Sequence, residues 1–257
     1  MSETALSIGG LKFCLQLSAL PRADREIAPF VAAAEGTCDV AVEYWPDESV
    51  SDAEVTVSPA ADRVTVRYHP GLSYRFAALR GCMIYIPMEQ ILLAHRRFFL
   101  HASFIATPFG GLLFTGDSGV GKSTQAELWR EHMDSTVING DRAIVAKEAD
   151  DWRAYGSPYA GSSGYYVCRD EPIRAIVLLE QAAENRVDIV SSAEVFRRLM
   201  LQISIDHSRT EDVERLCDLV IELFTAVPVY RLRCTPDARA VNALCEALRK
   251  EGANGRQ

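Results

Sequence analysis

The feature that most constrains the fold of this chain is the octapeptide GDSGVGKS at residues 116–123. It fits the phosphate-binding pattern GxxxxGK[ST] at every fixed position. A short apolar segment at residues 111–115 precedes it and is predicted to be a strand, and residues 124–130 are predicted to be a helix. A glycine-rich loop between a strand and a helix turns backbone N–H groups and a helix N-terminus toward phosphate oxygens. The motif therefore predicts an α/β nucleotide-binding domain.

The pattern predicts a chemical role for the polar residues of this loop. Lys122 is expected to reach the β- and γ-phosphates, and the Ser123 hydroxyl to ligate Mg²⁺. Nucleotide contacts are expected along the loop and the residue after it, from Gly116, Asp117, Ser118, Gly119, Val120, Gly121, Lys122, Ser123 and Thr124. The alternative is a glycine-rich turn that binds nothing. Because all fixed positions and both flanking elements are present, the sequence favours phosphate binding.

A second metal ligand is predicted after the next strand. Residues 136–139 form a short apolar segment, and Asp141 follows it. In phosphate-loop enzymes a strand-end carboxylate of this kind completes the Mg²⁺ site, directly or through water. The expected cofactors are ATP, or another nucleoside triphosphate, and Mg²⁺ held by Ser123 and Asp141.

Composition excludes several classes of partner. The 257 residues are 48% hydrophobic, with 27 basic and 35 acidic side chains that give a formal charge of −8. This acidic excess argues against nucleic acid or an anionic membrane as a general partner, and no apolar run is long enough to cross a bilayer. The seven cysteines are scattered, without a CxxC pair. They are expected to be reduced thiols of a cytoplasmic protein.

The chain is predicted to contain two domains. Residues 1–90 are rich in strand patterns, with period-two alternation at 11–17 and 64–68, and form a β-rich N-terminal subdomain. Residues 91–257 form the nucleotide-binding domain. The aromatic residues of the first part could be a recognition surface, but packing within the sheet is favoured for Tyr44, Trp45, Tyr68 and Tyr74.

Within the second domain, residues 98–106 are predicted to be a strand that turns at 108–111 directly into the strand before the loop. Such a short turn requires an antiparallel hairpin. Further on, 143–147 and 152–155 are predicted to pair as a hairpin, 173–179 to be a buried strand, and 156–164 to be either a lid or a plain connection.

Helices are expected after the buried strand. Ser191 and Glu194 form a capping-box pattern at the start of one. Thr235 as cap and Pro236 at the first position are predicted to begin the last one.

Four segments together resemble a known family. Residues 100–103 (LHAS), the hairpin, the loop at 116–123 and residues 139–141 (NGD) are similar to the kinase domain of HPr kinase/phosphorylase. The resemblance covers roughly residues 95–249. It implies a phosphoenolpyruvate carboxykinase-like α/β domain with a mixed sheet, preceded here by the β-rich subdomain, which matches nothing in the family. The chain therefore resembles a relative of the family and not the carbon-regulation enzyme itself.

The resemblance also implies roles for individual residues. His101 matches the family's active-site histidine, Lys122 and Ser123 its phosphate- and metal-binding residues, and Asp141 the second of two adjacent aspartates. The family usually has Glu where this chain has Thr124. It also has an aspartate, resembling a general base, where this chain has Gly140.

Because position 140 is a glycine, the sequence does not identify the residue that accepts the proton of the attacking hydroxyl. Asp117 and His101 are the nearest candidates, or transfer runs without a strong base, which a loose transition state tolerates. A Gly140→Asp variant is expected to be tolerated or to be faster.

Two functions follow. The first is an ATP- and Mg²⁺-dependent kinase that transfers the γ-phosphate to a hydroxyl, either the serine of a peptide or protein or a small serine-like molecule, with His101, Asp117, Lys122 and Asp141 as catalytic residues. The second is a nucleotide-binding module with little catalysis that holds a peptide or protein partner. A phosphoenolpyruvate carboxykinase is disfavoured because the chain is too short. The sequence leaves the acceptor, the purine preference and the oligomeric state open.

Overall fold

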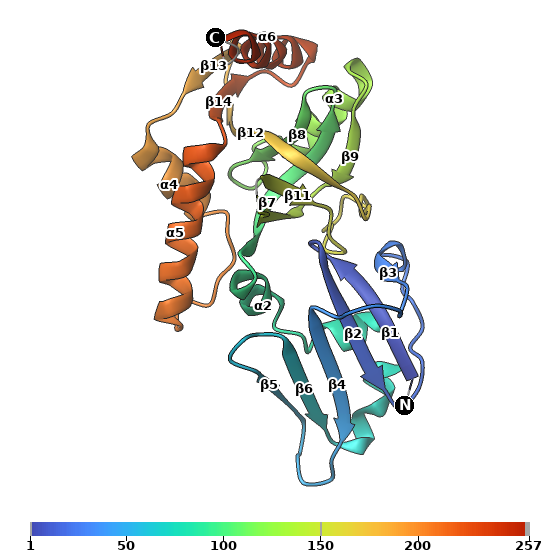
Figure 1. Ribbon diagram of the computed structural model, residues 1–257. Coiled ribbons are helices and arrows are strands. Elements are labelled where there is room, and N and C mark those ends of the chain that lie inside the picture. The colour runs from blue at the N-terminus through green and yellow to red at the C-terminus, as the bar shows by residue number, and fades with distance from the viewer. Residues whose placement is uncertain (1, 150, 255–257) are drawn as a thin grey trace. The chain divides into compact units, whose positions relative to one another are not determined.

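The computed structural model describes residues 2–149 and 151–254; residues 1, 150 and 255–257 of the predicted domains lie outside the described residues. It divides into two compact units, Met1–Arg97 and Phe98–Gln257 (Figure 1). The boundary follows helix α2 (Met88–Ala94), whereas the sequence placed it after residue 90. Each unit contains a sheet with both parallel and antiparallel pairs.

The first unit is built on a six-stranded sheet in the order β3-β1-β2-β4-β6-β5. Its strands are β1 (Ser2–Ile8), β2 (Leu11–Leu17), β3 (Val31–Ala32), β4 (Val40–Pro46), β5 (Ala53–Val57) and β6 (Arg63–Tyr68). Two 3₁₀ helices (Ala28–Phe30 and Pro70–Ala77), α1 (Leu79–Met83) and α2 complete the unit. The predicted strands at 11–17 and 64–68 are confirmed, because alternating apolar residues there bury one face of the sheet.

Two of the four aromatic residues named above pack in this unit's core. Tyr44 and Tyr68 are buried, and their rings lie 5.2 and 4.3 Å from that of Phe76. Trp45 and Tyr74 are exposed. Packing is therefore confirmed for Tyr44 and Tyr68 and is wrong for the other two.

The prediction that all cysteines are reduced is also wrong. Cys14 in β2 and Cys38 form a disulfide, with their Cα atoms 5.9 Å apart. Parallel pairing of β2 with β4 places Phe13 opposite Val40, so the residues just before β4 lie beside β2. Sequence spacing does not show this proximity, because a parallel pair joins segments distant in the chain.

The second unit is built on an eight-stranded sheet in the order β11-β10-β7-β8-β12-β14-β13, with β9 paired to β7. Its strands are β7 (Arg97–Thr107), β8 (Gly110–Thr115), β9 (Thr136–Asn139), β10 (Arg142–Lys147), β11 (Trp152–Tyr155), β12 (Asp170–Gln181), β13 (Arg186–Ile189) and β14 (Val229–Cys234). The predicted hairpin of β10 and β11 is confirmed, and so is the buried strand within β12.

The strand before the 116–123 loop, β8, lies in the middle of this sheet. It pairs antiparallel with β7, from Ala102 opposite Thr115 to Thr107 opposite Gly110, as the short turn predicted. On its other side it pairs parallel with β12. The Thr115 hydroxyl donates to the carbonyl oxygen of His101 at 2.8 Å, so His101 lies beside the residue where the loop begins.

Four helices accompany the sheet: α3 (Lys122–His132), α4 (Ser192–Met200), α5 (Thr210–Ala226) and α6 (Ala238–Asn254). Buried residues of α3 and α6, including Trp129 and Leu244, share a core with Phe114 of β8 and Val177 of β12. Burial of this apolar surface holds α3, and with it the end of the loop, in place. No helix in the described part of the chain combines the length and apolar character needed to cross a bilayer.

The predicted start of α4 is confirmed but its capping bond is not, and the last helix starts later than predicted. Ser191 is the N-cap of α4, but its side chain makes no capping hydrogen bond. The last helix begins at Ala238, not at Pro236. There the Asp237 carboxylate accepts from the N–H of Arg239 at 2.9 Å, which is the bond expected of a capping aspartate.

Candidate functional site

The backbone of the 116–123 loop is shaped by its glycines. Gly119 and Gly121 have φ values of 77° and 112°, a region that disfavours any other residue, and a Cβ on either would project into open space. Gly121 is the N-cap of α3 and supplies no side-chain cap, and the first helical bond runs from Gln125 N–H to its carbonyl. The N–H groups of residues 122–124 are therefore without intrahelical acceptors, which is the arrangement that binds anions.

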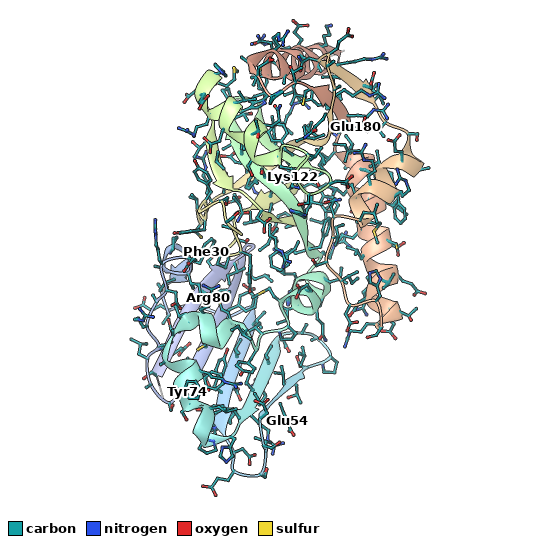
Figure 2. All side chains as sticks on the ribbon, turned by 180° about the vertical axis from the view of Figure 1, so that it is seen from behind. Phe30, Glu54, Tyr74, Arg80, Lys122 and Glu180 are labelled. Carbon is teal, nitrogen blue, oxygen red and sulfur yellow. A yellow bond between two sulfur atoms is a disulfide. The ribbon has the colours of Figure 1, made fainter. Side chains whose placement is uncertain are left out.

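Lys122 is the cation of this loop (Figure 2). Its side chain is buried, and Nζ donates to the carbonyl oxygens of Gly116 at 2.9 Å and Asp117 at 3.2 Å. Burial lowers the pKa of Lys122, although the charges of Asp141 and Asp117 oppose the shift. The ammonium group is thus held inside the loop by backbone oxygens.

A cavity of about 370 Å³ lies along one side of the loop. We call it the His101 cavity, and it is lined by His101, Ser118, Gly119, Gly121, Lys122, Ser123, Thr124, Gly140, Asp141, Ala160, Ser162 and Ser163. It brings together, from β7, from the segments that follow β8 and β9, and from the start of α3, most of the residues that the sequence singled out. Ala160, Ser162 and Ser163 were not among them, although the hydroxyl-rich segment at 156–164 was a signal that could have pointed to the two serines.

His101 and Asp141 contact each other in this cavity, with Nε2 3.3 Å from Oδ1. Burial and the charge of Lys122 lower the pKa of His101, whereas Asp141 acts in the opposite direction. The imidazole is therefore mainly neutral at pH 7, and the contact is a hydrogen bond donated by a neutral ring to a carboxylate. Asp141 itself is fixed, because its N–H donates to Asn139 Oδ1 and its carbonyl accepts from Ala102 N–H, both at 2.9 Å.

A short segment at residues 160–164, which we call the serine loop, packs against residues 140 and 141. A Cβ placed on Gly140 would lie 2.3 Å from both Cβ and Oγ of Ser163, and one on Gly161 would lie 2.9 Å from the Asp141 carboxyl group. A side chain at position 140 would therefore require Ser163 to move, and the tolerance of Gly140→Asp stays a prediction.

Asp117 lies on another side of the loop. A second cavity of about 730 Å³, the α4 cavity, is lined by Gly116, Asp117, Ser118, Gly119, Val120, Leu179, Glu180, Gln181, Glu194, Arg197, Arg198, Leu201 and Gln202. Asp117 does not line the His101 cavity. The two candidate proton acceptors therefore face different spaces.

A third cavity, of about 540 Å³, opens where the carboxyl ends of β12 and β14 meet the start of α3. It is lined by Gly119, Val120, Gly121, Thr124, Gln125, Gln181, Ala182, Cys234, Thr235 and Pro236. Val120, which also lines the α4 cavity, and Thr124, which also lines the His101 cavity, belong to this wall. The Gln181 amide donates to the Gly119 carbonyl at 3.2 Å and ties the end of β12 to the loop.

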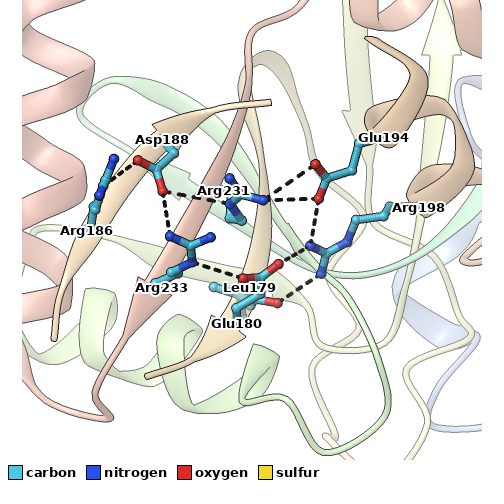
Figure 3. A network of polar contacts seen from close by, with 8 residues as sticks. All are labelled: Leu179, Glu180, Arg186, Asp188, Glu194, Arg198, Arg231 and Arg233. Carbon is cyan, nitrogen blue, oxygen red and sulfur yellow. Dashed lines mark hydrogen bonds and ion pairs between the residues drawn. The ribbon is translucent and has the colours of Figure 1, made fainter. Parts of the chain in front are cut away.

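Helix α4 is connected to the sheet by a closed ring of charges (Figure 3). Acids and arginines alternate around it in the order Glu180, Arg198, Glu194, Arg231, Asp188 and Arg233. Arg231 lies 3.2 Å from Glu194 and 3.8 Å from Asp188, and Arg233 lies 3.3 Å from both Asp188 and Glu180. Burial raises the pKa of Glu180, but hydrogen bonds from Arg198 and Arg233 outweigh it and leave the pKa lowered.

This ring joins β12, β13, β14 and α4 beside the α4 cavity. Sequence reasoning missed it, because its members are spread from residue 180 to residue 233 and show no periodic pattern.

Comparison with known proteins shows a distant similarity to solved structures. The chain is a mixed α/β protein with two mixed sheets, and neither a known family profile nor a curated protein sequence matches it. Among solved structures it is similar to the Hpr(Ser) kinase/phosphatase from Coxiella burnetii, with a TM-score of 0.33 and 15% sequence identity over 61% of this chain and 91% of that one. This likeness is distant, and the proposed function rests on the residues of the site.

Proposed function

We propose that this chain binds a nucleoside triphosphate at the 116–123 loop and transfers its γ-phosphoryl group to a hydroxyl. The observation that carries the proposal is the His101 cavity. In it, the buried Lys122 ammonium, the free N–H groups at the start of α3, the Ser123 hydroxyl and the His101–Asp141 pair line one space. Phosphoryl transfer depends mainly on positioning and on charge stabilisation, and these groups supply both.

The donor set fits a magnesium nucleotide. The Ser123 hydroxyl and the Asp141 carboxylate are oxygen donors in the lining of the same cavity, and Mg²⁺ is bound in proteins by one or two such oxygens with substrate phosphates. The metal, when bound, would neutralise charge on the phosphate oxygens. Lys122 and the N–H groups of residues 122–124 would hold the phosphates themselves.

His101 is the proton acceptor that the geometry favours. With Nε2 donating to Asp141, the other ring nitrogen of the neutral imidazole carries a lone pair. Asp141 orients the ring, and a neutral histidine can accept the proton of an attacking hydroxyl. Asp117, in the α4 cavity, is less suited to that role.

A second function, nucleotide binding with little catalysis, is favoured by Gly140. The position supplies no carboxylate beside Asp141, and the serine loop covers it. In that case the chain would bind a nucleotide and hold a peptide or protein partner without transferring phosphate.

The Lys122→Ala variant tests the shared nucleotide-binding step. Loss of a charged hydrogen bond to phosphate costs about 1.5–3 kcal/mol, so the affinity for Mg²⁺–ATP should fall by roughly 10- to 100-fold in calorimetry. Lys250→Ala, on the exposed face of α6, is the matched control and should bind as the wild type does. Equal affinities in all three proteins would contradict the proposal.

The chain is then incubated with serine peptides, free serine and ATP that is labelled at its γ-phosphate. This experiment distinguishes the two functions. Label on an acceptor supports the kinase. Binding without any transfer supports the binding module.

A further inference from the structure

We propose that this chain phosphorylates itself on Ser163, so that the serine loop is the first acceptor of the γ-phosphoryl group. The inference rests on the proposed function of the same site. It assigns a substrate to that function, namely the side-chain hydroxyl of a loop that belongs to the chain itself.

Ser163 shares the His101 cavity with the groups that would hold the triphosphate. Lys122, Ser123 and Asp141 line that cavity together with Ser163. Ser163 is half-buried, and it is one of the residues that line this cavity. An acceptor in this space needs no second molecule to reach the γ-phosphate.

The position of the Ser163 side chain depends on the absence of a side chain at Gly140. The ideal Cβ position of Gly140 lies 2.3 Å from Cβ and Oγ of Ser163, so the serine occupies the place that any side chain at position 140 would need. Gly140 does not have a positive φ, so its backbone conformation would accept alanine. The absence of a side chain here leaves room for Ser163, in the cavity that His101 and Asp141 also line.

The serine loop holds the hydroxyl in a defined but adjustable position. Ser163 Oγ donates to the Ala160 carbonyl at 2.6 Å and accepts from Tyr165 N–H at 3.3 Å. Gly161 and Gly164 flank the two serines with φ values of 55° and 73°. Small rotations at these glycines would release Oγ from the Ala160 carbonyl and turn it toward a bound phosphate.

Other serines at the site are less suited. Ser162 is exposed, and Ser123 is the proposed metal ligand. Ser157 is fully buried and donates to the Arg142 carbonyl at 2.5 Å.

The transfer balances without a further reactant. Ser163 Oγ forms a bond to the γ-phosphorus of the nucleoside triphosphate, and the bond from that phosphorus to the β,γ-bridging oxygen breaks. The nucleoside diphosphate leaves, and the hydroxyl proton passes to the neutral ring of His101. The product is a phosphoserine, which carries about two negative charges near Lys122.

The test begins with the purified wild-type chain and Mg²⁺–ATP, followed by intact mass measurement and peptide mapping. We expect one phosphate per chain, on Ser163, at a rate that does not change when the protein is diluted. Ser163→Ala should abolish the modification, whereas the matched Ser162→Ala should retain it. Gly140→Ala, whose Cβ would displace Ser163, should reduce the rate by tenfold or more, beyond any loss of nucleotide affinity.

Each other outcome is decisive. Phosphate on another residue, or transfer only to external acceptors, overturns the assignment of Ser163. Bound nucleotide with an unmodified wild-type chain also overturns it, while leaving nucleotide binding intact. Failure to bind Mg²⁺–ATP in calorimetry would instead refute the proposed function on which the inference rests. Site mapping on the wild type decides the matter even if a variant does not fold.

Discussion

At the scale of single residues, His101 is set between neighbours of opposite charge. Lys122 lowers its pKa and Asp141 raises it. We therefore predict that Asp141→Asn lowers the pKa of His101 further and that Lys122→Ala raises it. Titration of the histidine ring protons by NMR in the free protein measures both shifts, and shifts of the same sign in the two variants would refute the assignment.

The direction of the shift also determines the pH dependence. Because the pKa of His101 in the folded chain lies below the ordinary value of 6.5, folding favours the neutral ring. Its contribution to stability is therefore present above pH 6.5 and is lost as the pH falls below that value. Single-turnover transfer should decline over the same acidic range, since a protonated ring accepts no proton.

Sequence reasoning located most single residues of the site but not their neighbours. The motif identified Lys122 and Ser123, the end of a short apolar strand identified Asp141, and His101 came from the family resemblance and its place on the strand before the loop strand. The sequence predicted both Asp117 and His101 as candidate proton acceptors. The position of Asp117 in the motif does not show which side of the loop its side chain faces. Ser163 reaches Gly140 only through tertiary packing, which no local pattern encodes.

At the scale of elements, the charge ring should hold α4 against the sheet. Arg231 pairs with Glu194 and Asp188, and 19% of its side chain is exposed. We predict that Arg231→Met lowers the free energy of unfolding by about 1–3 kcal/mol, since it removes one arginine partner from each of two half-buried carboxylates and leaves Glu194 only its longer contact with Arg198. Denaturant titration measures the loss.

Arg186→Met is the matched control. Its side chain is 71% exposed and contacts the same Asp188, so the cost should be about 0–1 kcal/mol. Equal losses in the two variants would show that the ring contributes no more than a surface pair.

The disulfide in the first unit is a second feature at this scale. Cys14 and Cys38 are 24 residues apart, and closing a loop of that size typically stabilises the folded state by about 2–4 kcal/mol. Cys14→Ser combined with Cys38→Ser should lower stability by that amount, and reductant should have the same effect on the wild type only. Cys217→Ser, which removes a thiol outside the bridge, is the control.

Elements with strong local patterns were predictable. The turn at 108–111 was short enough to force the β7–β8 hairpin, and the strand patterns at 143–147 and 152–155 predicted the hairpin of β10 and β11. The strand β13 was missed because it is four residues long and none of them is fully buried, so it lacks a hydrophobic pattern. It is stabilised by pairing with β14 and by the charges of the ring.

At the scale of the whole molecule, the mixed α/β class and the β-rich first unit follow from composition and strand patterns. The finer assignment to a phosphoenolpyruvate carboxykinase-like fold stays a prediction, because strand order is set by long-range pairing. Here β12 lies between β8 and β14, strands that are distant from each other in the chain.

Ligand binding should be visible in the stability of the molecule. Mg²⁺–ATP at about 100 times its dissociation constant should stabilise the folded state of the second unit by about 2.7 kcal/mol. Hydrogen exchange in the slowest amides of β8 and α3 would measure this gain. Lys122→Ala at the same nucleotide concentration should show a much smaller gain, and an equal one would place binding elsewhere.

The contact between Gly140 and Ser163 has a consequence for sequence variation. The two positions lie 23 residues apart, yet the space can hold a side chain from only one of them. In homologous chains, a residue with a Cβ at position 140 should therefore coincide with a shortened or rerouted serine loop, whereas chains that retain glycine at 140 should retain a small hydroxyl residue at 163. Such paired substitution would separate chains that carry their own acceptor from chains that receive it from outside.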